Sequence, residues 1–509
     1  MSTPPLVIFG IDAGDPEFLT RWAGAGDLPN LARIMDRGSW GLTGGAELVS
    51  EHGVWVSIFS GISRRDHGYF YFRQMEPGTY DLHAVTGLDV DAPPFWVQDR
   101  AEGRRATVLD IPDYDVVPGL QGIQLCHWAT HNNWDPEHFV TAAEPAEVLD
   151  EVARRFAPRM VTVENHDAAV EDDFRILDEL LDRVAKKGAA CRYLLERDRW
   201  DLFATVFAES HTANHQFWKY RPELDGGAPV HPRLSDGIRD VYRAIDRELG
   251  LVLEILPPDA RVFVVSSVGM EDDFPITGLI EAFCRRFGYQ ASPRGSGSRP
   301  ARRPIDLARK IVPERWRLAL SRRLSREARE RLLADIFRAS TDWRNTRAFA
   351  LPSAYTGFLR VNLKGREPDG IVAPGAEYAA LLDRLEADLA TLVDPRSGRA
   401  AVTRTTRTTD AFGCPPHPTL PDLWVDWLPG RFLDRITFPG GELTQERPDF
   451  YRRSDHADRG FFAAAGPGIA ARGDIGAVDV LDLAPTFQAL LGRPPTARMS
   501  GAPIRPLLG

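Results

Sequence analysis

The sequence predicts an α/β protein in which a mainly parallel central sheet is sandwiched by helices and carries a helical insertion. Short apolar runs rich in β-branched and aromatic residues alternate with longer segments whose apolar residues recur at helical spacing. Runs such as 6–11, 200–208 and 261–266 are almost wholly apolar, so both faces of these strands are expected to be buried. Strands of this kind that alternate with helices are typical of a parallel sheet with helices on both sides.

Length and composition are those of an ordinary globular protein. The 509 residues are enough for a large hydrophobic core and one or two domains. Hydrophobic residues make up 43% and charged residues 26% of the chain, the usual balance in a soluble protein. The formal net charge of −10 argues against nucleic acid as the main partner, because proteins that bind it present basic surfaces.

The cysteines and the apolar segments indicate the cellular compartment in which we expect the protein. The four cysteines are scattered without a Cys-x-x-Cys pair, which is neither a disulfide framework nor a zinc ribbon and fits a reducing environment. The apolar run 6–11 has no basic lead-in and ends at Asp12, so we interpret it as a core strand and not as a signal peptide. No uninterrupted apolar span is long enough for a membrane helix. We therefore expect a soluble, cytoplasmic protein.

The first strand and the helix pattern after it place polar residues at a sheet edge. Strand 6–11 delivers Asp12 at its carboxyl end. In the segment 48–61, the apolar residues have helical spacing from position 54 onward. Ser50 and Glu51 are therefore expected at or just before a helix N-terminus, where backbone N–H groups favour an anion.

The same alternation continues along the chain. Further strands are expected at 105–110, 122–126 and 423–427, and helices at 28–35, 145–157, 173–197, 378–392 and 480–491. The sequence shows no internal repeats.

A basic region interrupts the α/β pattern. Residues 294–298 are rich in glycine and serine and predict a flexible link, and in 301–331 arginine and lysine far outnumber the acids. Such a segment could cover an anionic substrate or lie on a membrane surface, but we favour the solvated face of a helical insertion. We therefore expect 1–275 and 340–509 to form one catalytic domain, with 276–339 as a basic, largely helical insertion.

A pair of histidines follows the strand pattern 200–208. The chain turns polar after this run and has a helical pattern, on which His211 and His215 are four residues apart and share one face. Two imidazoles at this spacing can bind one Zn²⁺, although two surface histidines at a helix start would give the same pattern. Glu209 could orient one of these histidines without binding the metal itself, or it could simply be an acid in the first turn of the helix.

Several short motifs occur in an order that resembles a known family. They are Gly10-Ile11-Asp12, Leu28-Pro29-Asn30-Leu31, Trp55 with Ser60-Gly61 and His67-Gly68, Asp455-His456, Gly466-Pro467-Gly468-Ile469, and Asp482-Leu483-Ala484-Pro485-Thr486. Each motif is short, but the ordered set resembles the alkaline phosphatase superfamily, in particular its type I phosphodiesterase/nucleotide pyrophosphatase branch. This resemblance covers most of the chain outside the basic insertion.

The resemblance implies a metal site at the carboxyl edge of the sheet. Members of the family bind two Zn²⁺ ions there, one of them through an Asp and two His. The corresponding residues here are His211, His215 and His456, so that a histidine stands where the family has Asp. Three neutral imidazoles are a ligand set found in hydrolytic zinc enzymes.

The second metal site departs from the family pattern. Its ligands would be Asp12, a Ser or Thr nucleophile, and an Asp-His pair. Ser267-Val268 stands where that pair should be, and valine cannot bind a metal while a serine hydroxyl is a poor ligand. The nucleophile position falls on Glu51, next to Ser50. We therefore expect one zinc ion per chain.

These assignments lead to a functional hypothesis. The resemblance implies a zinc-dependent hydrolase that acts on a small anionic substrate, a phosphate or sulfate ester, with a phosphodiester favoured. Ser50 would act as nucleophile or Glu51 as general base, and Asp12 would complete the metal shell or act as base. His52 and His131 are candidates for substrate binding, although a lone histidine is more often structural. The alternatives are a mononuclear zinc enzyme of a biosynthetic pathway (lyase, acyl transfer or cyclisation) and a non-catalytic binder of a phosphorylated ligand.

Overall fold

The chain folds into two compact units in the computed structural model, each with its own hydrophobic core. The structure describes residues 3–50, 52–98, 104–130, 139–157, 169–222, 231–272, 278–293, 326–353, 355–446 and 453–508. The first unit comprises Met1–His67, Thr86–Phe274 and Phe450–Gly509, and the second comprises Gly68–Val85 and Pro275–Asp449.

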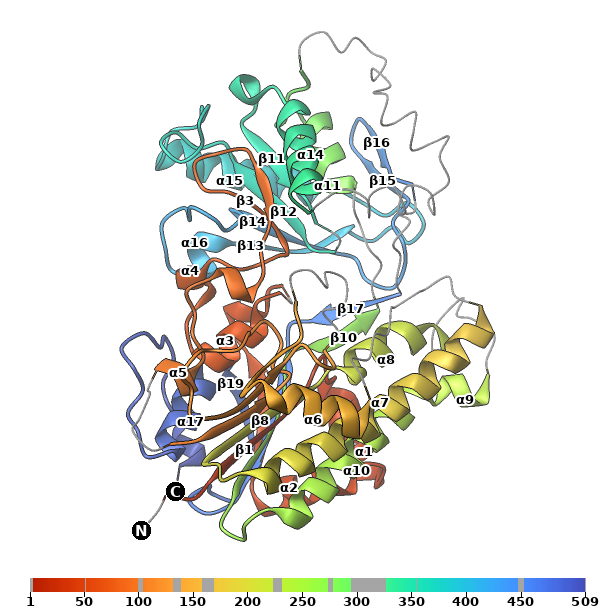
Figure 1. The fold of residues 1–509 in the computed structure, drawn as a ribbon. Helices are drawn as coiled ribbons and strands as arrows, with labels where there is room; N and C mark the ends of the chain where they lie inside the picture. The colour runs from red at the N-terminus through yellow and green to blue at the C-terminus, as the bar shows by residue number, and fades with distance from the viewer. Residues whose placement is uncertain are drawn as a thin grey trace. The chain divides into compact units, whose positions relative to one another are not determined.

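The first unit is built on a nine-stranded sheet of order β19-β2-β18-β9-β1-β8-β5-β6-β7 (Figure 1). Its strands are β1 (Leu6–Ile11), β2 (Ser39–Gly44), β5 (Ala106–Leu109), β6 (Gly122–Cys126), β7 (Ala142–Glu144), β8 (Leu202–Phe207), β9 (Arg261–Ser266), β18 (Gly460–Ala465) and β19 (Gly473–Asp479). The run β9-β1-β8-β5-β6 is parallel throughout, while β18 and β7 pair antiparallel. The predicted α/β fold with a mainly parallel sheet is confirmed.

Helices cover both faces of this sheet. They are α1 (Pro16–Ala25), α2 (Pro29–Arg37), α3 (Val54–Ser60), α4 (Arg64–His67), α5 (Phe95–Gln98), α6 (Glu147–Phe156), α7 (Val170–Arg197), α8 (Glu209–Phe217), α9 (Pro232–Ser235), α10 (Gly237–Ile255) and α17 (Leu483–Leu490). Figure 1 shows α3 and α17 on one side of the sheet and α7 and α10 on the other. Two faces covered by helices explain why β1 and β8 are buried along their whole length.

The register of the central strands brings their carboxyl ends together. Ile11 lies opposite Phe207 on one side and opposite Ser266 on the other. The residues that follow these three strands are therefore neighbours, although they are far apart in the sequence. The parallel sheet in this way places Asp12, the start of α8 and Ser267 at one edge.

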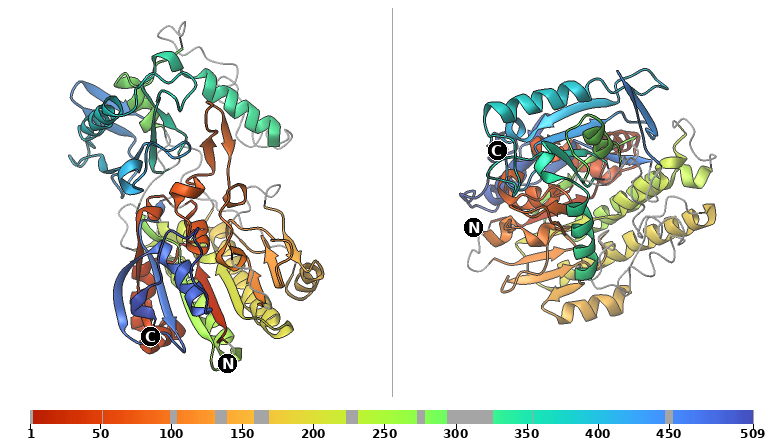
Figure 2. Two further views of the ribbon diagram at one scale, coloured as in Figure 1. Left: turned by 90° about the vertical axis from the view of Figure 1, so that its left-hand side faces the viewer. Right: turned by 90° about the horizontal axis from the view of Figure 1, so that it is seen from above.

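The second unit has an antiparallel sheet of its own, of order β11-β12-β14-β13. Its elements are β3 (Arg73–Met75), β4 (Leu82–Ala84), α11 (Leu279–Arg286), α14 (Arg326–Ala339), β11 (Ala348–Leu351), β12 (Gly357–Val361), α15 (Ala376–Leu389), β13 (Val402–Arg407), α16 (Thr408–Ala411), β14 (Leu423–Trp427), β15 (Arg435–Phe438) and β16 (Gly441–Thr444). The left view of Figure 2 shows the hairpin β3–β4 beside α14.

The expected domain boundaries need correction here. Residues 340–449 were expected to join the main sheet, but the structure places them in the second unit together with 275–339. A buried apolar run such as β14 has the same sequence pattern whichever sheet it joins. The pattern therefore could not assign these strands to one of the two sheets. Helix α14 agrees with a helical insertion, while 294–325, with most of its basic residues, lies outside the described residues. No helix in the described part of the chain is both long and apolar enough to cross a bilayer.

Candidate metal centre

Helix α8 begins directly behind β8 and carries the two closely spaced histidines. Every residue of the helix is buried. The Ser210 hydroxyl donates to the Asp12 backbone carbonyl at 2.6 Å, and the Asn214 side-chain amide donates to the Ala13 carbonyl at 2.7 Å. These two bonds attach α8 to the end of β1, and they fix the face on which His211 and His215 lie.

His211, His215 and His456 come together at this edge. One ring nitrogen from each residue lies within 4.8 Å of the other two. The His211 and His456 rings are nearly parallel, with centroids 5.1 Å apart, and the His215 ring stands across both of them. The Nε2 atoms of His215 and His456 are 3.2 Å apart. The predicted convergence of the three imidazoles is confirmed.

A short antiparallel strand pair delivers the third histidine. His456 lies on β17 (Ser454–Ala457), opposite Met270 on β10 (Gly269–Asp272). Strand β10 follows almost directly after β9, whose end is fixed in the central sheet. His456 is therefore held beside α8 even though it is 241 residues from His215 in the sequence.

The outward-facing nitrogens of two of these rings have polar partners. Nδ1 of His215 lies 2.9 Å from the Ser454 hydroxyl, and Nδ1 of His456 lies 3.3 Å from a carboxylate oxygen of Asp455. Partners of this kind fix the orientation of metal-binding histidines.

The geometry of this cluster fits a zinc ion. Two nitrogens that bind zinc at about 2.0–2.1 Å in a tetrahedral site are about 3.3 Å apart, close to the 3.2 Å between His215 and His456. The donors are neutral imidazoles, His215 is 1% exposed and His211 is 9% exposed. Three protein ligands leave the fourth position of a tetrahedral ion for a substrate or water, as in catalytic zinc sites.

Asp12 lies at the end of β1 but outside this group of three among the described residues. Its Oδ1 accepts hydrogen bonds from the Trp55 indole at 2.6 Å and from the Ser267 hydroxyl at 3.0 Å. The side chain is 4% exposed, and a buried carboxylate needs such donors. Asp12 therefore holds the strand end together, a role that the sequence did not indicate.

The residues at the second metal position do not fit a metal ion. The Ser267 hydroxyl accepts from the Ala13 backbone N–H at 3.0 Å while it donates to Asp12. Val268 is 3% exposed and packs in the hydrophobic core. Hydrogen-bond donors and an apolar side chain thus occupy the place where the resemblance implied an Asp-His pair.

Arg64 holds the loop that carries the expected reacting groups. Its Nη2 donates to the backbone carbonyls of Glu47, Ser50 and His52 at 2.7–2.8 Å, and the residue is fully buried. Ser50 is 8% exposed and His52 is half-buried, just before α3. Glu51 and His131 lie outside the described residues. Sequence reasoning missed Arg64, although an arginine so close to His67-Gly68 was a possible signal.

The carboxylate of Glu47 completes the support of this loop. It accepts from the hydroxyls of Ser57 and Ser63 and from the backbone N–H of Arg64. Burial raises the pKa of Glu47, and the Arg64 charge and these hydrogen bonds oppose that shift. Buried hydrogen bonds to the Glu47 carboxylate therefore anchor the loop in addition to apolar packing.

Glu209 does not contact the histidine rings but forms a buried ion pair with α7. Its carboxylate lies 3.3 Å from Nε of Arg183, and both side chains are at most 3% exposed. One turn further along α7, Lys187 forms a second buried pair with Asp110 at 3.2 Å. Removing one partner of such a pair typically costs about 3–5 kcal/mol, so α7 fixes the start of α8 firmly.

Comparisons with known proteins agree with the fold. The model of the type I phosphodiesterase / nucleotide pyrophosphatase family matches residues 6–280. Murine ectonucleotide pyrophosphatase/phosphodiesterase 5 has a similar structure (TM-score 0.51, 12% identity, 99% of this chain and 100% of that chain covered). Its inactive variant in complex with AMP gives 0.52 at 12%, and the human protein 0.50 at 10%, with the same coverage. No curated protein matches the sequence.

At these identities the solved structures establish the fold, while the family model covers more than half of the chain. The carboxyl edge of the parallel sheet, where the three histidines meet, lies within the first unit, to which almost all of the matched residues belong. The chain therefore belongs to the type I phosphodiesterase / nucleotide pyrophosphatase family of hydrolases, in the alkaline phosphatase superfamily.

Proposed function

We propose that the protein hydrolyses a small phosphodiester with a single zinc ion held by His211, His215 and His456. The observation that carries the proposal is the convergence of three imidazole nitrogens at the carboxyl edge of the sheet. Family membership supports phosphodiester hydrolysis as the reaction. The murine variant in complex with AMP has the same fold, which supports a small phosphate ester as the ligand.

The chain's own residues prepare the centre. Zinc bound there supplies a Lewis acid for a phosphoryl oxygen. Ser454 lies beside Nδ1 of His215 and Asp455 lies beside Nδ1 of His456, where both can orient these rings for a metal. Burial of the cluster strengthens its electrostatic interactions, because the local dielectric is low.

Two neighbouring groups are candidates for the reacting residue. Ser50 would attack phosphorus as nucleophile, whereas Glu51 would remove a proton from an attacking water. Arg64 donates to the Ser50 and His52 carbonyls, so it fixes the backbone on which Ser50 lies. The guanidinium is engaged with carbonyls, and we assign it a positioning role rather than substrate contact.

A second candidate function keeps the zinc but changes the reaction. In two-metal enzymes the second ion stabilises attacking or leaving oxygens. The hydrogen bonds from Trp55 and Ser267 engage Oδ1 of Asp12, and Ser267-Val268 offers no Asp-His pair, which supports chemistry with one Lewis acid. A mononuclear lyase, acyl transferase or cyclase, or a binder of a phosphorylated ligand, would use the same cluster.

Elemental analysis combined with three chromogenic esters tests both candidates. The purified protein should contain one zinc per chain and hydrolyse bis(4-nitrophenyl) phosphate faster than 4-nitrophenyl phosphate. Two stoichiometric zinc ions with fast monoester hydrolysis would contradict the single-site proposal. Zinc with turnover of 4-nitrophenyl acetate and no diester hydrolysis would support the second candidate. A zinc-free chain that hydrolyses the diester would refute the metal centre.

A further inference from the structure

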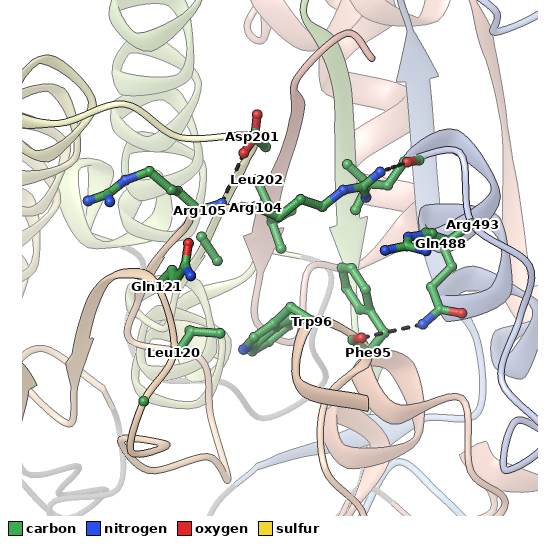
Figure 3. Close-up of a pocket in the computed structure, with 13 residues that line it drawn as sticks. Phe95, Trp96, Arg104, Arg105, Leu120, Gln121, Asp201, Leu202, Gln488 and Arg493 are labelled. Carbon is green, nitrogen blue, oxygen red and sulfur yellow. Dashed lines mark hydrogen bonds between the residues drawn. The ribbon is translucent and has the colours of Figure 1, made fainter. Parts of the chain in front are cut away.

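Carboxylates that accept backbone N–H groups join distant segments at both edges of the main sheet. At the amino edge, the Asp201 carboxylate accepts from the backbone N–H of Arg105 at 2.9 Å, in the wall of a pocket of about 170 Å³ (Figure 3). At the carboxyl edge, beside the metal centre, Asp15 lies in the turn after β1 and is 3% exposed. A carboxylate buried this deeply needs donors, so it fixes the segments that donate to it.

The two oxygens of Asp15 hold two different segments. Oδ1 accepts from the backbone N–H of Phe18 at 3.0 Å and caps the start of α1. Oδ2 accepts from the backbone N–H of Met270 at 2.9 Å, 255 positions along the chain. Met270 lies on β10, directly opposite His456 on β17. The second bond of Asp15 therefore reaches the residue that is paired with the third histidine of the cluster.

The strand pair β10–β17 needs support from outside. It has two strands and four residue pairs, and a sheet of two strands is marginally stable by itself. In an antiparallel ladder, a residue's N–H either bonds to the partner strand or faces the other edge. The Met270 N–H bonds to Asp15, so it belongs to the edge of β10 that β17 does not cover. Asp15 therefore holds the strand pair from its outer edge.

Close packing accompanies this hydrogen bond. A Cβ atom added to Gly269 would lie 3.1 Å from Cδ of Pro16 and 3.2 Å from Oδ2 of Asp15. It would also lie 3.1 Å from the backbone carbonyl of Arg459. Distances this short leave no room for a side chain unless the neighbours move, so β10 lies directly against the turn that carries Asp15.

The backbone of Asp15 connects the same turn to α8. Its N–H donates to the phenol oxygen of Tyr242 at 3.0 Å, and the Asn214 side-chain amide donates to the same oxygen at 3.1 Å. Asn214 directly precedes His215. Burial raises the pKa of Tyr242, and the Asp15 charge adds to this shift, so the phenol stays neutral. Asp15 is thus linked to both elements that carry the histidines.

We propose that Asp15 is a positioning residue of the metal centre, which holds β10 and thereby sets the place of His456 beside α8. Its carboxylate oxygens are engaged by Phe18 and Met270, so it acts through β10 and not as a metal ligand. This inference rests on the proposed function, because it treats the three histidines as a zinc site.

Asp15→Ser separates the bond to β10 from the cap of α1. Serine caps a helix about as well as aspartate, but its single oxygen cannot also accept from Met270. Asp246→Ser is the matched control, because the Asp246 carboxylate is also buried and accepts from the backbone N–H groups of Asn30 and Leu31 at α2. If Asp15→Ser does not fold, Asp15→Asn replaces it, since asparagine keeps the cap and the size but has one acceptor oxygen.

Hydrogen exchange of the metal-free chain, followed by mass spectrometry, measures the hold on the strand pair. In Asp15→Ser, the amides of 269–272 and 454–457 should exchange about tenfold or more faster, because a hydrogen bond to a charged acceptor is lost. In Asp246→Ser they should exchange as in the natural chain. Unchanged exchange in Asp15→Ser, or equal acceleration in both variants, would overturn the inference.

Zinc affinity, from competition with a chelator, measures the effect on the centre. Asp15→Ser should bind zinc about 10–100-fold more weakly, as expected when a residue that orients a ligand is lost, and its Co²⁺ form should have a changed visible absorption spectrum. Asp246→Ser should keep the natural affinity and spectrum. Unchanged zinc affinity in Asp15→Ser would overturn the positioning role and leave the proposed function intact. A natural chain that binds no zinc would instead refute the proposed function, and the exchange of 454–457 would still decide whether Asp15 holds His456 in place.

Discussion

The three-histidine cluster and the second metal position lie at the same edge of one sheet, but they differ in what their polar groups contact. In the cluster, ring nitrogens face one another and the outward nitrogens of His215 and His456 have polar partners. At the second position, Asp12 remains but its Oδ1 accepts from Trp55 and Ser267. The Asp12 carboxylate thus has hydrogen-bond donors as neighbours, whereas the ring nitrogens of the cluster have one another.

This difference shows that the residue type alone does not identify a metal ligand. A buried carboxylate needs compensation, and an ion or hydrogen-bond donors can both supply it. Here an indole and a hydroxyl supply it. The partners of a ligand therefore say more about the metal than the ligand itself, and the following predictions test that view from the largest effect to the smallest.

His215→Ala should have the largest effect. It removes the central ligand of the cluster, so we expect loss of bound zinc together with loss of diester hydrolysis, well beyond the about 10–100-fold effect of removing an outer-shell partner. Elemental analysis and kinetics measure both quantities. The exposed His231→Ala is the matched control and should keep its zinc. Full zinc content in His215→Ala would show that the cluster is not the site.

Ser50→Ala and Glu51→Gln together identify the reacting group. Loss of a general base typically lowers the rate about 10²–10⁴-fold, and loss of a nucleophile should be at least as severe. Only the variant of the reacting residue should show this drop in kcat, and both should keep zinc. Wild-type rates in both variants would mean that neither group takes part in the chemistry.

Asp455→Asn should weaken the metal centre without removing it. Asn removes the negative charge that lies 3.3 Å from Nδ1 of His456, so zinc affinity should fall about 10–100-fold. Competition with a chelator measures this affinity. An unchanged affinity would show that Asp455 does not orient His456.

The double variant Ser267→Asp/Val268→His restores the family pair at the second position. If the missing Asp-His pair is the only reason why a second zinc does not bind, the zinc content should rise from one to two per chain. Val268→His alone is the control and should stay at one, since a single added ligand does not complete a site. One zinc in the double variant would mean that the bond from Trp55 to Asp12 also prevents binding.

Trp55→Phe should have the smallest effect and should act on stability alone. It removes one of the two donors to Oδ1 of Asp12, and a hydrogen bond to a buried charged group contributes about 1.5–3 kcal/mol. Urea denaturation should show this loss while zinc content stays at one per chain. A change in zinc content would show that the hydrogen bond from Trp55 to Asp12 also affects metal binding, which the contacts of these residues do not indicate.

Sequence reasoning reached much of the fold and the metal cluster but not the partners of its residues. Strand β8 and the spacing of His211 and His215 are local signals, so periodicity predicts them. The bonds from Trp55 and Ser267 to Asp12 span 43 and 255 positions, and only the folded register shows them. For the same reason, the apolar runs of 340–449 did not reveal which sheet they join.

The strand pair β10–β17 has a consequence for how the chain can change in length. Asp272 lies opposite Ser454, so the intervening chain is a closed loop whose ends the ladder fixes. Closing a loop costs only about 0.6 kcal/mol more for each doubling of its length, and large insertions there are therefore tolerated. A one-residue deletion within β17 is different, because it would turn His456 to the other face of the ladder. During evolution, the position of His456 therefore does not depend on the length of the chain between Asp272 and Ser454. A shift of one residue in β17, by contrast, would remove His456 from the centre.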